Sequence, residues 1–179
     1  SEDSINSSDI EYLTDSHPDI LRISYHPHSE TLIDFAVPGT TNTKIVHDLL
    51  VDANNNPIDG TGIKIGVLDT GIDYNHPDLI DAYKGGWNSY GDNDDPMDYY
   101  GHGTHCAGII AGSGISSDGK LRGISPGVDL YAFQVCNNSG NCSQSNIVDG
   151  IERALDPDGD FENGMDILSI SLGVGDFPL

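Results

Sequence analysis

Basic residues are scarce in this chain. Only 7 of its 179 residues are lysine or arginine, against 29 aspartates and glutamates, and the formal net charge is −22. A protein that binds nucleic acid or an anionic membrane surface needs a cluster of basic side chains, and so few cannot form a substantial one. We therefore expect neither nucleic acid nor a membrane as a partner.

Long hydrophobic runs are also missing, since no apolar stretch approaches the roughly 18 residues that a membrane-spanning helix needs. Hydrophobic residues make up 36% of the chain and 22 residues are glycine, which is typical of a loop-rich globular protein. Residues 1–44 are mostly polar and acidic. They predict a tail or the end of an upstream or pro segment, followed by one folded domain over residues 45–179.

Cysteine occurs only three times. Cys136 and Cys142 enclose a short polar loop, and this spacing allows a disulfide between them. Cys106 lies in an apolar, glycine-rich segment and is expected to remain a free thiol. Three reduced thiols in a cytosolic protein are the alternative, whereas a bridge would indicate an extracellular or secreted protein.

From residue 63 onward, strand patterns alternate with helix patterns. We expect strands at 63–69, 86–90, 128–135 and 165–173, and helices at 103–112 and 143–155. Short β-branched apolar runs indicate buried strands, and apolar residues three or four positions apart indicate helices. This alternation predicts an α/β fold, a parallel sheet flanked by helices, with ligands beyond the carboxyl ends of the strands.

Two side chains suited to catalysis lie at the expected element boundaries. Asp69 ends the strand 63–69, so its carboxylate emerges at the edge of the sheet, although an isolated aspartate there could equally cap the turn. His102 lies between two glycines where a helix begins, and the helix dipole favours the neutral imidazole that a general base needs. His105 raises the alternative of a metal-binding histidine pair, against which stand the spacing and the lack of further ligands.

Three long segments resemble blocks of the subtilisin-like serine peptidases, the subtilases. GVLDTGIDYNHPDL (66–79) is similar to their aspartate block, GHGTHCAGIIAG (101–112) to their histidine block, and ILSISLG (167–173) to their substrate-pocket strand. The three occur in the family's order with near-family spacing. The stretch DNDDPMDYYGHGTH and the two-cysteine loop look more like the larger secreted subtilases that carry a protease-associated insertion.

The resemblance implies a subtilisin-like fold and peptide-bond hydrolysis. Asp69 is similar to the aspartate that orients the imidazole, and His102 to the general base. One wall of the primary specificity pocket is implied at Ser171, Leu172 and Gly173, and the opposing strand at Ser139, Gly140, Asn141 and Cys142. A polypeptide substrate would pair between these segments through its backbone. Val174 departs from the family pattern, because many relatives have a further glycine there.

The family's nucleophile lies in a Gly-Thr-Ser-Met-Ala block, preceded by an oxyanion-hole asparagine, and neither element occurs after the pocket strand in these 179 residues. We therefore expect the N-terminal part of a subtilase catalytic domain, incomplete at its C-terminal side. It would be inactive alone and completed by the C-terminal part of the same protease. The alternative is a non-catalytic peptide-binding or calcium-binding remnant of a subtilase.

No cofactor is expected for catalysis, but acidic residues predict a structural calcium ion. Asp156, Asp158 and Asp160 alternate in one short loop, where their oxygen atoms can converge on a hard cation. Asp78 resembles a calcium-ligand position of some subtilases. A solvated acidic loop without an ion is the alternative.

Overall fold

The computed structural model describes residues 43, 46–47, 51–157 and 163–173, all within one compact unit, Ile33–Leu179. The strands are β1 (Lys64–Asp69), β2 (Tyr83–Asn88), β3 (Asp129–Gln134) and β4 (Ile167–Ile170). The helices are α4 (His102–Ala111), the 3-10 helix η2 (Ile115–Ser117) and α5 (Gln144–Leu155). The strand expected at 86–90 in fact begins three residues earlier, at Tyr83.

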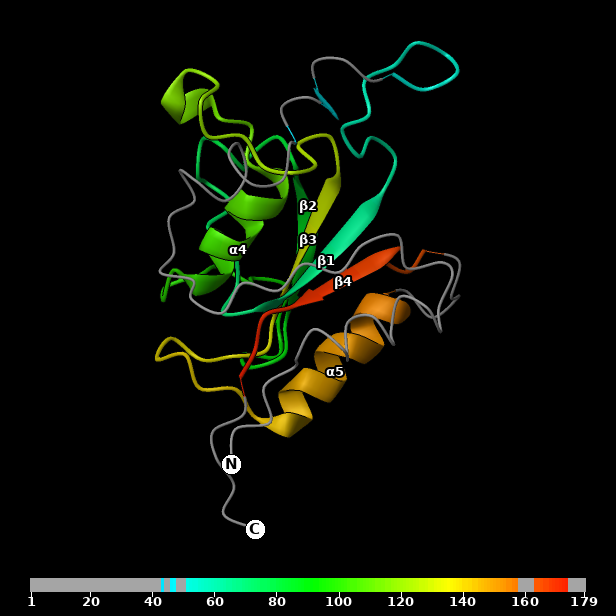
Figure 1. Ribbon diagram of the computed structural model, residues 1–179. Helices are drawn as coiled ribbons and strands as arrows, with labels where there is room; N and C mark the ends of the chain where they lie inside the picture. The colour runs from blue at the N-terminus through cyan, green and yellow to red at the C-terminus, as the bar shows by residue number, and fades with distance from the viewer. Residues whose placement is uncertain (1–42, 44–45, 48–50, 158–162, 174–179) are drawn as a thin grey trace, which may run out of the picture. The chain divides into compact units, whose positions relative to one another are not determined.

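The four strands form one parallel sheet in the order β2-β3-β1-β4 (Figure 1). Within it, β1 pairs with β3 from Lys64 to Asp69. On the other side of β1, Leu68 lies opposite Ile170 at the end of β4. Because all strands run in the same direction, their carboxyl ends meet at one edge of the sheet. The predicted α/β fold with a parallel sheet is confirmed.

Helices cover both faces of the sheet, α4 on one and α5 on the other (Figure 1). Successive residues of a strand point to opposite faces, so β1 and β3 contribute to both hydrophobic layers. Buried residues of the α4 layer include Ile65, Val67, Leu130, Ala107 and Ala111. Those of the α5 layer include Leu68, Phe133, Val135 and Ala154. The two layers therefore pack β1 between the two helices.

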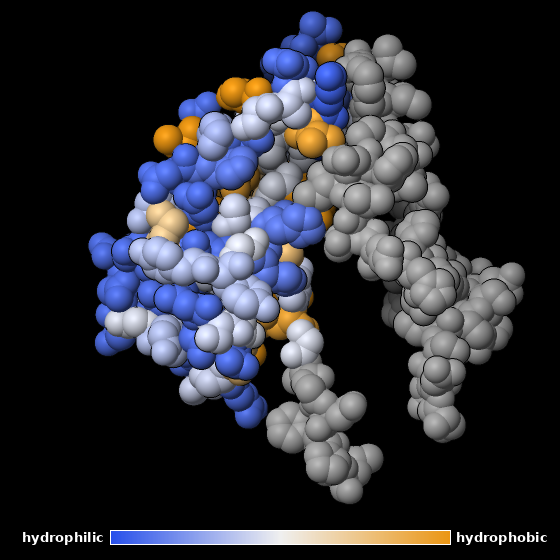
Figure 2. All heavy atoms as spheres, turned by 90° about the vertical axis from the view of Figure 1, so that its left-hand side faces the viewer, coloured by the Kyte–Doolittle hydropathy of each residue, from blue (hydrophilic) through white to orange (hydrophobic). Residues whose placement is uncertain are grey.

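The surface on the side of α4 is mainly hydrophilic, and its hydrophobic residues form small, separate patches (Figure 2). This distribution agrees with the strong excess of acidic residues in the sequence. Within the described ranges, the structure contains no helix with both the length and the hydropathy required to span a membrane.

Candidate active site

Asp69 is the last residue of β1, and its side chain is completely buried. Its Oδ1 accepts a hydrogen bond of 2.7 Å from the backbone N–H of Thr70. The backbone carbonyl of Asp69 accepts hydrogen bonds from the N–H groups of Val135 and Cys136, which follow β3. Hydrogen bonds to the side chain and to the backbone carbonyl of Asp69 therefore hold this residue at the carboxyl edge of the sheet.

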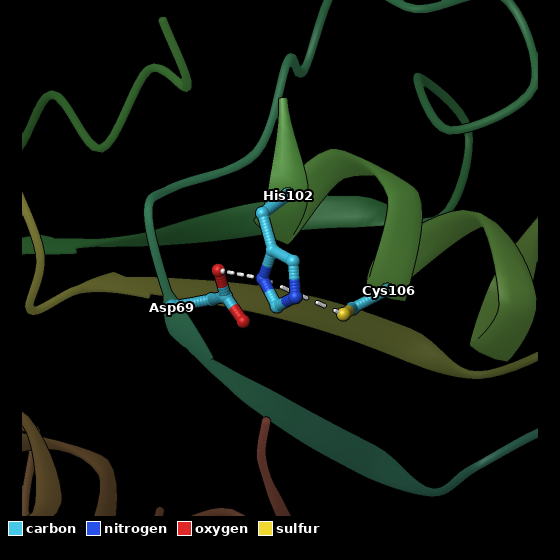
Figure 3. A group of neighbouring side chains, drawn as sticks. All are labelled: Asp69, His102 and Cys106. Atoms are coloured by element: carbon cyan, nitrogen blue, oxygen red, sulfur yellow. Dashed lines mark hydrogen bonds and ion pairs between the residues drawn. The ribbon is translucent and has the colours of Figure 1, made fainter. Parts of the chain in front are cut away.

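His102 is the first residue of α4, and its imidazole points at Asp69 (Figure 3). Its Nδ1 lies 2.7 Å from Asp69 Oδ1. Because a carboxylate only accepts hydrogen bonds, Nδ1 carries the proton and Nε2 is the ring nitrogen left to accept another. The side chain is 46% exposed, so a reacting group can reach it. This is the arrangement that a general base with an orienting carboxylate requires.

A glycine allows α4 to begin directly on the turn that follows Asp69. A Cβ atom on Gly103 would lie 2.1 Å from the carbonyl oxygen of Gly71 and 3.0 Å from Asp69 Cβ. The Gly103 N–H also donates a hydrogen bond of 2.9 Å to Thr70 Oγ1. The close approach of helix and turn therefore depends on the missing side chain.

Asp98 fixes the start of α4, a role that the sequence interpretation missed. Its Oδ1 accepts hydrogen bonds from the N–H groups of Tyr100 (2.9 Å) and Gly101 (2.8 Å). Its Oδ2 accepts from the N–H (2.9 Å) and Oγ1 (2.6 Å) of Thr104. These bonds satisfy donors that a helix start leaves free, and the charge suits the helix dipole. The sequence signal for this role was an aspartate shortly before a predicted helix.

The protonation of Asp98 should couple the stability of the protein to pH. Burial acts to raise the pKa of Asp98, but hydrogen bonds from the Gly101 backbone and from Thr104 outweigh it and hold the pKa below its usual value. A carboxylate with a lowered folded pKa stabilises the protein above its unfolded pKa, and this contribution is lost as pH falls through the folded value. Asp98→Asn should therefore lower the free energy of unfolding at pH 7 by about 1 kcal/mol.

Urea unfolding at pH 7 and at pH 3 checks this expectation. The difference between the parent chain and Asp98→Asn should shrink at the lower pH, because the parent carboxyl is then becoming protonated. Asp94→Asn is the matched control, since Asp94 is exposed and the substitution removes the same charge. A loss of the same size in both variants would show that the hydrogen bonds of Asp98 do not matter.

Cys106 lies one helical turn after His102, with its Sγ 3.9 Å from His102 Nδ1 (Figure 3). The potential ligand atoms of Asp69, His102 and Cys106 lie within 4.8 Å of one another, the single such group found in the described part of the chain. Burial raises the pKa of the Cys106 thiol, partly opposed by the Ser171 side chain. A thiol that stays protonated at neutral pH is a poor nucleophile.

This group contains His102 but not His105, so it does not include the histidine pair considered above as a metal site. His105 instead lines a separate cavity of about 320 Å³, together with His76 and Asp78. His105 and His102 therefore lie on different parts of the surface of α4.

The loop predicted to bind substrate is closed by a disulfide between Cys136 and Cys142, and Cys106 is free. Asn137 Oδ1 accepts hydrogen bonds from the N–H groups of Ser139 (2.9 Å) and Asn141 (3.0 Å) inside the loop. A Cβ atom on Gly140 would lie 2.8 Å from the Tyr100 ring, so the loop packs beside the residues that precede His102.

The second predicted substrate segment begins directly after β4. Ser171, Leu172 and Gly173 follow Ile170, and Ile170 lies opposite Leu68, the residue before Asp69. Both predicted segments therefore start at the carboxyl edge of the sheet that carries Asp69. Their contacts with a substrate stay a prediction, and Val174 lies outside the described residues.

Two of the four predicted calcium ligands, Asp78 and Asp156, lie in the described residues. Asp78 Oδ1 accepts hydrogen bonds from Ser116 N–H (2.8 Å) and from Ser113 Oγ (3.3 Å), so it anchors the loop after α4. In the parts of the chain that the structure describes, neither Asp78 nor Asp156 belongs to a group of three potential metal-binding side chains. Asp158 and Asp160 lie outside these parts, and calcium there stays a prediction.

Comparison with known proteins assigns this arrangement to a family. The model of the Subtilase family matches residues 60–177, and the chain belongs to this family. The resemblance found in the sequence blocks is therefore confirmed. Asp69 and His102 are consistent with the aspartate and histidine of the catalytic triad of these serine proteases.

Several named proteases are similar to this chain. Serine protease AprX of Bacillus subtilis (strain 168) is 38% identical over 134 residues, which cover 74% of this chain and 30% of that protein. Thermitase of Thermoactinomyces vulgaris is 38% identical over 115 residues, 64% of this chain and 39% of thermitase. Minor extracellular protease Vpr of Bacillus subtilis (strain 168) is 35% identical over 127 residues, 64% of this chain and 14% of Vpr. The chain thus spans well under half the length of each relative.

Proposed function

We propose that this chain supplies the general base and its orienting aspartate to a serine endopeptidase. The observation that carries the proposal is the contact of 2.7 Å between His102 Nδ1 and the buried Asp69 carboxylate in a chain of the subtilase family. The substrate of such an enzyme is a polypeptide.

The positions of the two side chains support the chemical roles proposed for them. His102 Nε2 takes the proton from a serine hydroxyl as its oxygen attacks the carbonyl carbon of the scissile peptide bond. The protonated His102 then gives this proton to the leaving amine, and an acyl-enzyme remains. Water releases the acyl group when the same nitrogen activates it as a base. Asp69 stabilises the positive imidazole in both steps, and its burial strengthens that attraction.

The proposal places the serine nucleophile and the oxyanion-hole asparagine in a C-terminal part of the same protease. Edge strand β4 supports this placement, because in the described residues it pairs with β1 alone. Its Ile167 and Ile170 are 51% and 47% exposed. An apolar edge strand of this kind favours pairing with another strand, which would continue the sheet beside the catalytic pair.

A serine-directed phosphonate probe tests the proposed function. We expect the completed protease to be labelled on a serine outside residues 1–179, and the isolated chain to remain unlabelled. Labelling should become far slower in a complex that carries His102→Ala. A label within residues 1–179, or equal labelling of that variant, would contradict the proposal. A native complex that binds peptides without any labelling would instead identify a peptide-binding remnant.

The disulfide loop should govern substrate binding more than bond cleavage. We propose that the substrate backbone pairs with residues 139–142 and 171–173. Replacing both Cys136 and Cys142 by serine removes the covalent link that closes the loop carrying residues 139–142. In the completed protease, KM for a long peptide should rise several-fold, on the order of 1 kcal/mol of lost binding, while kcat changes little.

Two measurements accompany this double variant. Peptide mapping without reductant should first show a linked 136/142 pair in the parent chain. The rate of phosphonate labelling is the internal control, because a small probe does not need to pair with residues 139–142 and 171–173. Unlinked thiols at both positions, or an unchanged KM in the variant, would contradict the assigned role of the loop.

We also propose an extracellular or secreted location. The disulfide between Cys136 and Cys142 supports it, because such bridges persist in oxidising compartments. The similarity to Minor extracellular protease Vpr agrees with it. Since Intracellular serine protease of Paenibacillus polymyxa is 41% identical over 118 residues, family membership leaves both locations open and the disulfide carries the proposal.

A further inference from the structure

A second cavity lies on the α5 face of the sheet, away from the catalytic pair. Its volume is about 330 Å³, within the range of about 300–1,000 Å³ that small-molecule sites occupy. Aromatic and cationic side chains dominate its wall: Lys64, Trp87, Tyr131, Phe133 and Arg153. Lys64 and Asp69 are the two ends of β1, so their Cα atoms are roughly 16 Å apart.

The polar groups of this cavity include hydrogen-bond donors without an acceptor. Trp87 Nε1 and Arg153 Nε are buried, and neither has a hydrogen-bond partner in the described residues. The guanidinium of Arg153 lies over the Trp87 ring, with Cζ 3.6 Å from the ring centroid. Its Nε is 3.5 Å from Asp149 Oδ1, an ion pair that leaves the N–H without a hydrogen bond. Both N–H groups therefore carry the free-energy cost of a buried donor without an acceptor.

Lys64 is a further donor in the wall, which also includes the polar residues Tyr131 and Asn163. Lys64 Nζ donates to the carbonyl oxygen of Asn163 at 3.3 Å, and an ammonium group has two further hydrogens to offer. Lysine, arginine and tryptophan side chains cannot accept hydrogen bonds. Two of the five lysines and arginines in the described residues line this one cavity, although the chain as a whole is strongly acidic.

The wall therefore combines flat apolar surfaces with cationic donors. Tyr131 and Phe133 alternate with core residues along β3 and face α5, next to Trp87 on the neighbouring β2. The missing side chain of Gly66 lets neighbouring side chains pack directly on β1: a Cβ atom on it would lie 2.9 Å from Leu168 Cδ2, 3.0 Å from Phe133 Cε2 and 3.1 Å from Met165 Cγ. An aromatic ring suits the apolar part of this wall, and a carboxylate suits Lys64 and Arg153.

We propose that this cavity is a binding site for a small aromatic carboxylate. The ring lies among Trp87, Tyr131 and Phe133, and the carboxylate accepts hydrogen bonds from Lys64 and Arg153. Binding here requires neither Asp69 nor His102, so the proposal stands apart from the proteolytic function.

The fluorescence of Trp87 provides a direct test, because it is the only tryptophan of the chain. The full chain is titrated with 3-phenylpropionate. We expect a saturable change in emission with a Kd of about 1 mM or lower, the range for a ligand of this size. The matched neutral probe, 3-phenylpropionamide, should bind at least about tenfold more weakly, because it lacks the charge.

Variants of the cationic side chains localise the binding. Arg153→Met and Lys64→Met should each raise the Kd for 3-phenylpropionate at least about tenfold. Lys84→Met is the control, because Lys84 pairs with Asp129 at 3.6 Å and does not line the cavity; its Kd should not change. Circular dichroism checks the fold of each variant, and Lys64→Met keeps the test valid if Arg153→Met fails to fold. No saturable change, equal binding of the amide, or equal weakening by Lys84→Met would overturn the proposal.

Discussion

In the completed protease, His102→Ala should lower kcat for peptide hydrolysis by about 10⁶-fold, and Asp69→Asn by about 10⁴-fold. The difference follows from the geometry. Removing His102 deletes the nitrogen that receives the proton. Asp69→Asn keeps that nitrogen, but it replaces a buried carboxylate by an amide that can donate to Nδ1 and so favours the wrong tautomer.

The measurement is steady-state hydrolysis of a peptide substrate, with active sites counted by phosphonate labelling and the fold checked by circular dichroism. His105→Ala is the matched control, since His105 lies on the same helix but lines a cavity that does not include His102. It should keep activity within about tenfold of the parent, as expected for a residue away from the reacting atoms. Activity of the same order in His102→Ala and the parent would refute the assignment of the base.

The pairing of Asp69 with His102 could be anticipated from the sequence. A buried apolar run ending in an aspartate places that carboxylate at the edge of a parallel sheet. A histidine at the first position of a following helix can reach the same edge. These two local patterns, together with the resemblance of the surrounding blocks, identify both residues. The structure adds the orientation, with Nδ1 rather than Nε2 toward the carboxylate.

The first residue of β2 could not be predicted from local sequence patterns. Glycine is a poor strand former, and the expected strand 86–90 included Gly86 but left out Gly85, whereas β2 begins at Tyr83. Gly86 belongs in the strand because its neighbour is close: a Cβ atom there would lie 1.9 Å from the carbonyl oxygen of Ala132 on β3. The residue whose closeness requires a glycine at position 86 lies on β3, more than 40 residues away in the chain. Tertiary packing overrides propensity at this position.

Other site features depend on contacts between distant elements. The position of Cys106 beside His102 requires the register of α4, and the stacking of Arg153 on Trp87 requires α5 to be docked on β2. Asp78 shows a different limit. The sequence showed its resemblance to a calcium-ligand position, but only the structure shows that its Oδ1 accepts hydrogen bonds from a backbone N–H and a serine hydroxyl. Calcium binding at Asp78 stays a prediction.

Gly103→Ala should cause a large loss of stability. The added Cβ would lie 2.1 Å from the carbonyl oxygen of Gly71, a backbone atom that cannot rotate away. Helix α4 must then move off the turn, which breaks the hydrogen bond from Gly103 N–H to Thr70 Oγ1 and separates His102 from Asp69. We expect the free energy of unfolding to fall by about 3 kcal/mol, and any catalytic activity of the completed protease to fall with it.

Gly108→Ala is the matched substitution on the same helix. A Cβ atom on Gly108 would have no neighbour within 4 Å, so it meets open space. Alanine is also the better helix former, and this variant should gain up to about 1 kcal/mol of stability. Urea unfolding followed by the fluorescence of Trp87 compares the two. If both variants lost stability equally, flexibility of α4 rather than the contact of Gly103 with Gly71 would govern this region. Opposite signs would show that the missing side chain of Gly103 is what lets the helix bring His102 to the carboxylate of Asp69.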